Sequence, residues 1–284
     1  MPSMKALKRR ITSVNNTQQI MKAMNLVAAS KVQRNRTKFE SVRSMFEQSK
    51  DFITNGVVHQ DALESPYYEK REVKRTAYIV ITGERGLCGS YNANISKIVI
   101  AHMNDGAKSE KVVAVGAKCK EYFVRRAKKV VEDHKGVLEH VQFYDASVIA
   151  QQAVDMYNSN DPEERVDEVF IAYTQFETLL SHHPTIVKLL PFEPSSEDTR
   201  LEEIYEPDVV TYLTKAVPIY LTMFVYGAMI ESAVCEQASR MTSMDSAARN
   251  AGEIAEDLTL QYNRQRQGAI TQEISEIVGG ANAI

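Results

Sequence analysis

The last part of the chain, from about Val209 to Val278, carries one long helical pattern. No proline follows Pro218, and apolar or small residues recur at alternating steps of three and four. Such a spacing, sustained over several heptads, is typical of a coiled coil. At 1.5 Å per residue the helix would be roughly 105 Å long, too long for a compact domain to bury. The seam reads Tyr220, Met223, Gly227, Ile230, Val234, Gln237, Met241, Met244, Ala248, Ala251, Ala255, Leu258, Tyr262, Gln265 and Ala269.

The first 55 residues carry a second seam of the same period, with no glycine before Gly56. Ser3 is a suitable N-cap for this helix. The seam reads Met4, Leu7, Ile11, Val14, Gln18, Met21, Asn25, Ala28, Val32, Asn35, Phe39, Val42, Phe46, Ser49 and Ile53. Its polar members weaken pairing but specify its register. We therefore predict that the two ends of the chain form one long antiparallel two-helix coiled coil.

The middle of the chain changes to a pattern of short apolar strands that alternate with helices. Strands are predicted at 76–82, 111–116, 129–131, 168–173 and 184–190, and helices at 95–103, 117–126 and 146–157. Alternation of this kind indicates a Rossmann-like α/β domain with a largely parallel sheet. The fold class is thus mixed, α+β and α/β. We expect segments at 1–58, 75–192 and 208–284, the last two joined by an acidic connector.

Charge is distributed unevenly along the first helix. Nine cations precede the first acid, Glu40. They are Lys5, Lys8, Arg9, Arg10, Lys22, Lys31, Arg34, Arg36 and Lys38. A solvated face is the simple explanation, but a bias of nine to zero favours contact with an acidic surface. Nucleic acid is disfavoured, since no aromatic side chains are interleaved with the cations for stacking.

Cysteine content and hydropathy disfavour two further kinds of structure, a cysteine-based framework or metal site and a membrane-spanning helix. Cys88, Cys119 and Cys235 are scattered and odd in number, which disfavours a disulfide framework or a metal site. The most apolar run, Ala216 to Ile230, is too short to span a bilayer and is expected to be the buried start of a helix. The amino-terminal residues contain no apolar signal core, and we expect them to belong to the mature protein.

The best candidate for chemistry is the turn from Gly83 to Gly89, directly after the first strand. Its glycines could hold a phosphate on backbone N–H groups, but the spacing is neither a dinucleotide fingerprint nor a phosphate loop. A tight turn is therefore the preferred interpretation. Cys88 could be a nucleophile with His102 or His134, although the sequence supplies no reason for their approach. His182 and His183 could ligate a metal, but a pair of turn residues is the default expectation.

Four blocks of the sequence together resemble the gamma subunit family of the rotary ATP synthases. They are Arg10 to Lys31, Arg85 to Gly89, Glu231 to Met241 with Arg249 to Ala251, and Ile270 to Ala281. The resemblance implies a bacterial-type, non-catalytic rotor subunit of the central stalk. It would couple proton flow through the membrane c ring to conformational cycling of the catalytic alpha and beta subunits. The implied partners are the alpha and beta subunits, the epsilon subunit and the c ring, with no nucleic acid and no cofactor or metal.

The resemblance also implies particular contacts. Carried over by motif, the candidate contacts with beta subunits are Lys22, Met24, Arg240, Gln267, Thr271 and Glu273. Tyr205 and Glu206 fall where the family meets epsilon and the c ring. The chain would be peripheral, on the cytoplasmic side of the inner (plasma) membrane, and held there only through the complex. The small, uncharged residues from Val278 to Ile284 suit either a bearing or a frayed terminus.

Two other classes of function stay open at this point. A nucleotide-dependent enzyme would use the turn from Gly83 to Gly89 and would bind ATP or NAD as an isolated chain. A passive coiled-coil scaffold would form a stable rod-shaped homodimer without other subunits. A rotor subunit would instead purify with several other kinds of chain.

Overall fold

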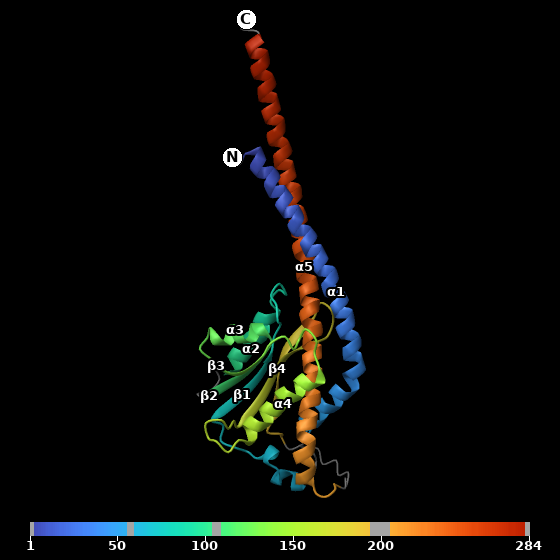
Figure 1. The fold of residues 1–284 in the computed structure, drawn as a ribbon, viewed down its shortest axis with the longest axis vertical. Coiled ribbons are helices and arrows are strands. Elements are labelled where there is room, and N and C mark those ends of the chain that lie inside the picture. The colour runs from blue at the N-terminus through green and yellow to red at the C-terminus, as the bar shows by residue number, and fades with distance from the viewer. Residues whose placement is uncertain (1–2, 56–59, 104–108, 194–204, 282–284) are drawn as a thin grey trace. The chain divides into compact units, whose positions relative to one another are not determined.

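The computed structural model describes residues 3–55, 60–103, 109–193 and 205–281. Two long helices, three shorter helices, two 3-10 turns and five strands follow one another along this part of the chain (Figure 1). In order they are α1 (Met4–Asn55), η1 (Gln60–Glu64), η2 (Pro66–Tyr68), β1 (Arg75–Ile81), α2 (Tyr91–Met103), β2 (Ser109–Val115), α3 (Ala117–Val124), β3 (Lys129–His134), α4 (Phe143–Asn158), β4 (Glu168–Phe176), β5 (His182–Leu190) and α5 (Val209–Ala281).

The contacts divide the chain into two compact units. Unit 1 consists of Met1–Ala29 and Arg240–Ile284, and unit 2 of Ser30–Ser239. Both long helices therefore contribute to both units. The division by compactness cuts across these helices, whereas the predicted segments 1–58, 75–192 and 208–284 follow the secondary structure. Those segment bounds stay a prediction.

The predicted antiparallel pairing of α1 with α5 is confirmed. Within unit 1, Gln18 lies against Ala248 and Asn25 against Met241. Residue numbers therefore increase along α1 where they decrease along α5, as in an antiparallel pair. In unit 2, the ring of Phe46 packs on that of Phe224 with centroids 5.1 Å apart. All fifteen predicted seam positions of each helix are buried or half-buried. The period of 3.5 residues thus identified the contact face correctly along both helices.

Side chains cap the starts of both long helices. Ser3 Oγ accepts the N–H of Ala6 at 3.3 Å, as expected of an N-cap. At the start of α5, the carboxylate of Asp208 accepts both the N–H and the hydroxyl of Thr211, each at 2.8 Å. Asp208 therefore satisfies donors that have no partner inside the helix. The predicted start of the last helix is confirmed.

The five strands form one sheet in the order β3-β2-β1-β4-β5, parallel except for the antiparallel hairpin of β4 and β5. Alternate side chains face opposite sides of a strand. On one face, Tyr78, Val80 and Val112 pack in a cluster with residues of α2 and α3. On the other, Ile79, Ile81 and Val113 pack with residues of α4, α1 and α5. The predicted α/β layer, with a largely parallel sheet, is confirmed.

One local expectation is wrong. His182 and His183, expected in a turn, are the first residues of β5, where they pair with Phe176 and Gln175. The turn lies just before them, since Ser181 O accepts the N–H of Thr178 at 2.8 Å. The strand is longer than its apolar run because antiparallel backbone pairing continues past the buried side chains.

Helix α5 is long and apolar enough to cross a membrane by length and composition alone. However, 72% of its most apolar window is buried inside the fold. The expectation that Ala216 to Ile230 starts a buried helix is therefore confirmed. Of the predicted acidic connector, 194–204 lie outside the described residues, as do 282–284 of the small-residue tail.

Candidate functional site

At the turn after β1, the protein itself occupies the backbone N–H of Gly83, and the turn's own carboxylate, Glu84, binds two neighbouring N–H groups. The N–H of Gly83 donates to Asn92 Oδ1 at 2.7 Å. The carboxylate of Glu84 accepts the N–H groups of Ala117 at 3.0 Å and Gly136 at 2.8 Å. A phosphate would have to displace these acceptors and lie beside a carboxylate. The expectation of a tight turn instead of a phosphate cradle fits this geometry.

The second carboxylate at this turn explains why a glycine stands there. A Cβ at Gly83 would lie 2.6 Å from Oε1 of Glu236, which is buried on α5. The turn is thus in close contact with the long helix, and a larger residue at Gly83 would have to displace the Glu236 carboxylate.

The two histidines considered as bases for the candidate nucleophile Cys88 are bonded elsewhere. Cys88 is 2% exposed, and its sulfur accepts the side-chain N–H of Asn92 at 3.2 Å. His102 is hydrogen-bonded to the Tyr78 hydroxyl and His134 to Gln152 Oε1, each at 2.8 Å. Neither histidine therefore serves Cys88. In the described part of the chain, no group of three or more His, Cys, Asp or Glu side chains could hold a metal ion.

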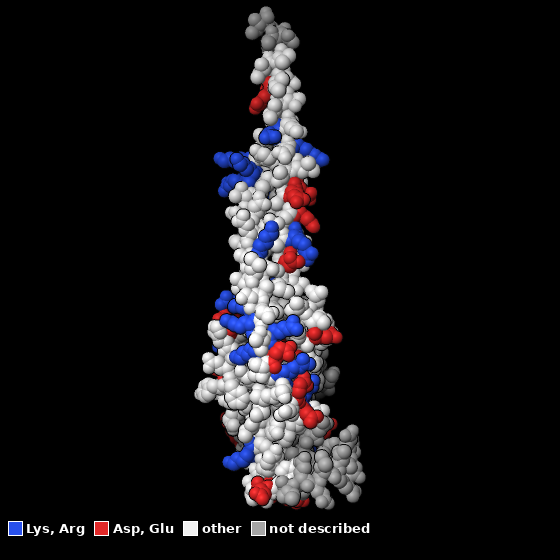
Figure 2. Space-filling view, turned by 90° about the vertical axis from the view of Figure 1, so that its right-hand side faces the viewer, with Lys and Arg blue, Asp and Glu red and all other residues white. Residues whose placement is uncertain are grey.

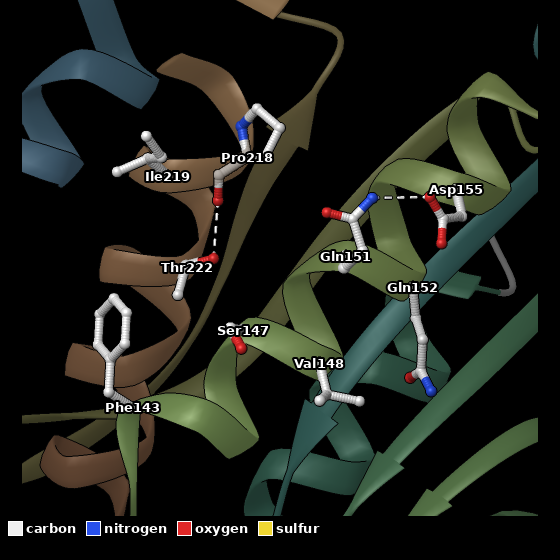
Figure 3. Close-up of a pocket in the computed structure, with 9 residues that line it drawn as sticks. All are labelled: Phe143, Ser147, Val148, Gln151, Gln152, Asp155, Pro218, Ile219 and Thr222. Atoms are coloured by element: carbon white, nitrogen blue, oxygen red, sulfur yellow. Dashed lines mark hydrogen bonds between the residues drawn. The ribbon is translucent and has the colours of Figure 1, made fainter. Parts of the chain in front are cut away.

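A cavity of about 600 Å³ lies between α4 and α5 in unit 2 (Figure 3). Apolar side chains, among them Phe143, Val148 and Ile219, form much of its wall. In the close-up, Gln151 donates to Asp155 at 2.8 Å, so two of the polar groups satisfy each other. Among its lining residues Asp155 is the one ionisable group, and none is cationic. The cavity therefore offers no cation to hold a nucleotide phosphate.

The six candidate contacts with beta subunits all lie in unit 1. Lys22 on α1 is exposed and Met24 is half-buried, while Arg240 on α5 is only 8% exposed. Gln267, Thr271 and Glu273 are all exposed near the end of α5. The structure thus places them along the two-helix unit, with the last three around the end of the α5 seam at Ala269.

Two polar seam residues of α1 hold the backbone of α5 within unit 1. Gln18 Nε2 donates to the carbonyl of Ala248 at 3.1 Å, and Asn25 Nδ2 donates to that of Met241 at 2.8 Å. Gly252 makes room for the first of these, because a Cβ there would lie 2.7 Å from Gln18 Nε2. Such directional bonds specify one register of the pair.

The charge of unit 1 is mixed, with an excess of cations. Nine Lys and Arg residues belong to it, against six Asp and Glu residues. Figure 2 shows side chains of both signs on the face that it draws. The strong bias of the first helix is therefore partly offset by the acids of α5, but the unit remains basic and suited to an acidic partner.

The end of α5 exposes an apolar stripe. Ile270, Ile274, Ile277 and Val278 expose 47%, 56%, 71% and 54% of their surfaces. Ile274 follows Ile270 by four residues, and Ile277 and Val278 follow Ile274 by three and four, which puts all four on one side of the helix. In unit 2, Tyr205 is half-buried against the ring of Tyr212, with centroids 5.0 Å apart, and Glu206 is exposed.

Glu231 on α5 is a buried acid that sequence reasoning did not place among the candidate residues. It is 4% exposed, and burial raises the pKa of its carboxyl to about 7. One oxygen accepts the N–H of Phe176 at 2.9 Å, and the other has no hydrogen-bond partner in the described structure. The sequence offered one indication of this buried acid, since Glu231 directly follows the most apolar run of the chain.

Comparison with known proteins identifies the family. The model of the family described as ATP synthase matches residues 3–284. An ATP synthase gamma chain from Desulforamulus reducens is 41% identical, over 100% of both chains. A sodium ion specific ATP synthase gamma chain from Acetobacterium woodii is 38% identical, over 98% of this chain and 97% of its own length.

The chain belongs to the ATP synthase gamma chain family. A gamma chain is a non-catalytic subunit of the ATP synthase complex. Among solved structures, the rotor of the Euglena gracilis mitochondrial ATP synthase is similar in fold, with a TM-score of 0.71. That likeness covers 94% of this chain and 98% of the other at 17% identity, so it concerns the fold alone.

Proposed function

We propose that this gamma chain is the central-stalk rotor subunit of an F-type ATP synthase. In this role it couples ion flow through the membrane c ring to conformational cycling of the catalytic alpha and beta subunits. The observation that carries the proposal is full-length membership in the gamma chain family, together with the paired terminal helices. A two-helix coil is stiff, and stiffness is what the transmission of torque requires.

Unit 1 is the proposed contact with the ring of alpha and beta subunits. Its excess of cations suits an acidic partner, and the exposed apolar stripe at 270–278 suits contact with an apolar surface of the partner. Lys22, Met24, Arg240, Gln267, Thr271 and Glu273 are the proposed contacts with beta. Because Arg240 is only 8% exposed, its contact would be made through the small part that reaches solvent.

The proposed partners of unit 2 are the epsilon subunit and the c ring, with Tyr205 and Glu206 as contacts. The chain would then be peripheral, on the cytoplasmic side of the plasma membrane, and would be held there by the complex. No cofactor or nucleic acid takes part in this function.

The proposed coupling ion is the proton. Ion selection belongs to the membrane part of the assembly, and one relative of this chain is named sodium ion specific at 38% identity. Inverted membrane vesicles distinguish the two ions. ATP-driven acidification should be insensitive to sodium, whereas a strict requirement for sodium would refute the proton assignment and leave the rotor role intact.

Purification from native membranes tests the rotor role itself. The chain should co-purify with several other kinds of polypeptide, and ATP hydrolysis should belong to that assembly but not to the isolated chain. Removal of residues 270–284 should impair coupled proton pumping more than assembly. A stable homodimer with no other subunits would favour a passive scaffold, and tight binding of ATP or NAD to the isolated chain would favour an enzyme.

A further inference from the structure

At its carboxyl end, β4 extends beyond its partner β1, and helix α5 takes the place of β1 there. The parallel pairing of β4 with β1 ends at Ala172 and Val80, although β4 itself continues to Phe176. In a strand, every second residue directs its N–H and C=O to the same side. The backbone groups of Thr174 and Phe176 therefore face the side that β1 has left, and buried groups there need partners.

Three side chains on one turn of α5 provide these partners. Ser232 Oγ accepts the N–H of Thr174 at 3.2 Å, and Cys235 Sγ donates to the carbonyl of Thr174 at 3.4 Å. Glu231 accepts the N–H of Phe176 at 2.9 Å. All of these residues belong to unit 2. We call Glu231, Ser232 and Cys235 the clamp.

Neighbouring contacts extend the clamp along the same side of α5. The hydroxyl of Tyr91, the first residue of α2, donates to the carbonyl of Ser232 at 3.1 Å. Ser239 Oγ donates to the carbonyl of Cys88 at 2.9 Å. The sheet thus contacts the long helix through directional bonds as well as through apolar packing, and directional bonds resist sliding and rotation.

We propose that Glu231, Ser232 and Cys235 position the sheet on α5 so that the two turn as one body, and that torque passes between them through the backbone of β4. This inference rests on the rotor role proposed above. The three residues are positioning residues, since they act on the sheet and touch no substrate.

The charge of Glu231 makes the clamp sensitive to pH. The groups that act on its carboxyl are Lys50, Glu47 and Arg43 on α1, together with Tyr173 on β4 and Cys235 on α5. Burial outweighs their effects and raises the pKa of Glu231 from 4.5 to about 7. The folded structure therefore favours the neutral carboxyl of Glu231. The contact between the clamp and β4 loses stability as the pH rises through about 7, because Glu231 then becomes charged.

Hydrogen exchange in the assembled complex tests the contacts directly. Loss of an acceptor should speed exchange of the amide that it protects by about tenfold. Glu231→Ala should do this at Phe176 and Ser232→Ala at Thr174, each measured against Ile171, a buried residue of β4 that is paired on both sides. Thr214→Ala is the matched control, because that exposed hydroxyl donates to Val210 O within α5 itself.

The pH profile separates a titrating clamp from ordinary packing. In the unaltered chain, the exchange of Phe176 relative to Ile171 should rise between pH 6 and pH 8. In Glu231→Gln, which stays neutral and nearly isosteric, the ratio should be constant. The role of the Glu231 charge would be overturned by either of two results. The exchange rate of Phe176 relative to Ile171 could stay constant with pH in the unaltered chain, or it could still rise with pH in Glu231→Gln. If Glu231→Ala fails to assemble, Glu231→Gln and Ser232→Ala carry the test.

Coupling is measured as protons pumped per ATP hydrolysed in membrane vesicles. Ser232→Ala and Glu231→Ala should reduce this ratio at least twofold while hydrolysis stays within twofold, and Thr214→Ala should change neither. Normal pumping despite faster exchange would overturn the transmission of torque through the clamp. Membranes that lack the whole chain are the second control: if they still pump, the rotor role itself fails, independently of the clamp.

Discussion

Helix α5 meets two different environments in the two units of the molecule. In unit 2, every residue from Phe224 to Glu236 is buried except Tyr226, which is half-buried. In unit 1, the buried positions after Met241 are Met244, Ala248, Ala251, Ala255 and Leu258, at steps of four and three. One continuous helix is thus a core element in one unit and half of a two-stranded coil in the other.

This difference shows that a heptad seam predicts the face on which two helices meet, but not whether the rest of the helix surface is buried. In unit 1, the seam between α1 and α5 accounts for nearly all the buried side chains, so the rest of the helix surface is exposed to solvent. In unit 2 the sheet and α4 cover the other sides of α5. We therefore expect similar changes to cost more in unit 2 than in unit 1, and the following predictions test that expectation in order of decreasing effect.

The largest difference is expected between two truncations on α1. Phe46 is 2% exposed and packs on the rings of Phe39, Tyr173 and Phe224, so Phe46→Ala should cost about 3–5 kcal/mol. Met21 is half-buried in the unit 1 seam, and Met21→Ala should cost about 1 kcal/mol. Urea unfolding of the full chain, followed by circular dichroism, measures both. Equal losses would contradict the contrast between the units.

The second prediction concerns the pH dependence of stability. A carboxyl whose pKa rises from 4.5 to about 7 on folding stabilises the fold fully below pH 4.5, and this stability is lost as the pH rises to about 7. The loss amounts to about 3 kcal/mol. Thermal unfolding between pH 4.5 and pH 8 should show that Glu231→Gln loses less stability than the unaltered chain. Parallel curves for the two chains would refute the assignment.

Two glycines of α5 provide the third test. A Cβ at Gly227 would lie 2.1 Å from Cδ2 of Phe46, in a packed core, so Gly227→Ala should cost about 1–3 kcal/mol. In unit 1, a Cβ at Gly252 would meet only the flexible end of Gln18, at 2.7 Å. Gly252→Ala should therefore be neutral or should gain up to about 1 kcal/mol from better helix propensity. Urea midpoints decide, and a destabilised Gly252→Ala would indicate a rigid seam.

The smallest effect is expected at the polar seam. Asn25→Ala removes the bond to the carbonyl of Met241, whereas Asn15 on the same helix is exposed. Both changes gain the same helix propensity, so Asn25→Ala should be less stable than Asn15→Ala by about 1 kcal/mol. Thermal unfolding by circular dichroism compares the two variants. Identical midpoints would mean that the Asn25 bond adds nothing to pairing.

Much of the fold was readable from local patterns. The seams of α1 and α5 predicted the antiparallel pair, and apolar runs predicted each strand of the sheet to within a few residues. The start of β5 was missed, because His182 and His183 pair through their backbone and carry no apolar signal. The candidate contacts with partner chains came from resemblance to the gamma subunit family, and they await a test in the assembly.

By itself, the sequence determined which face of each long helix meets the other, where the sheet lies, and to which family the chain belongs. Periodicity is sufficient for the helix faces and the strands, because the polarity of each residue reflects the burial of its own position. The family followed instead from the four sequence blocks that resemble the gamma subunits. Only the tertiary structure decided that the core segment of α5 is covered on all sides, and that Glu231 replaces a strand partner at the edge of β4. Those facts depend on groups 55 or more residues apart, whose meeting leaves no pattern in the local sequence.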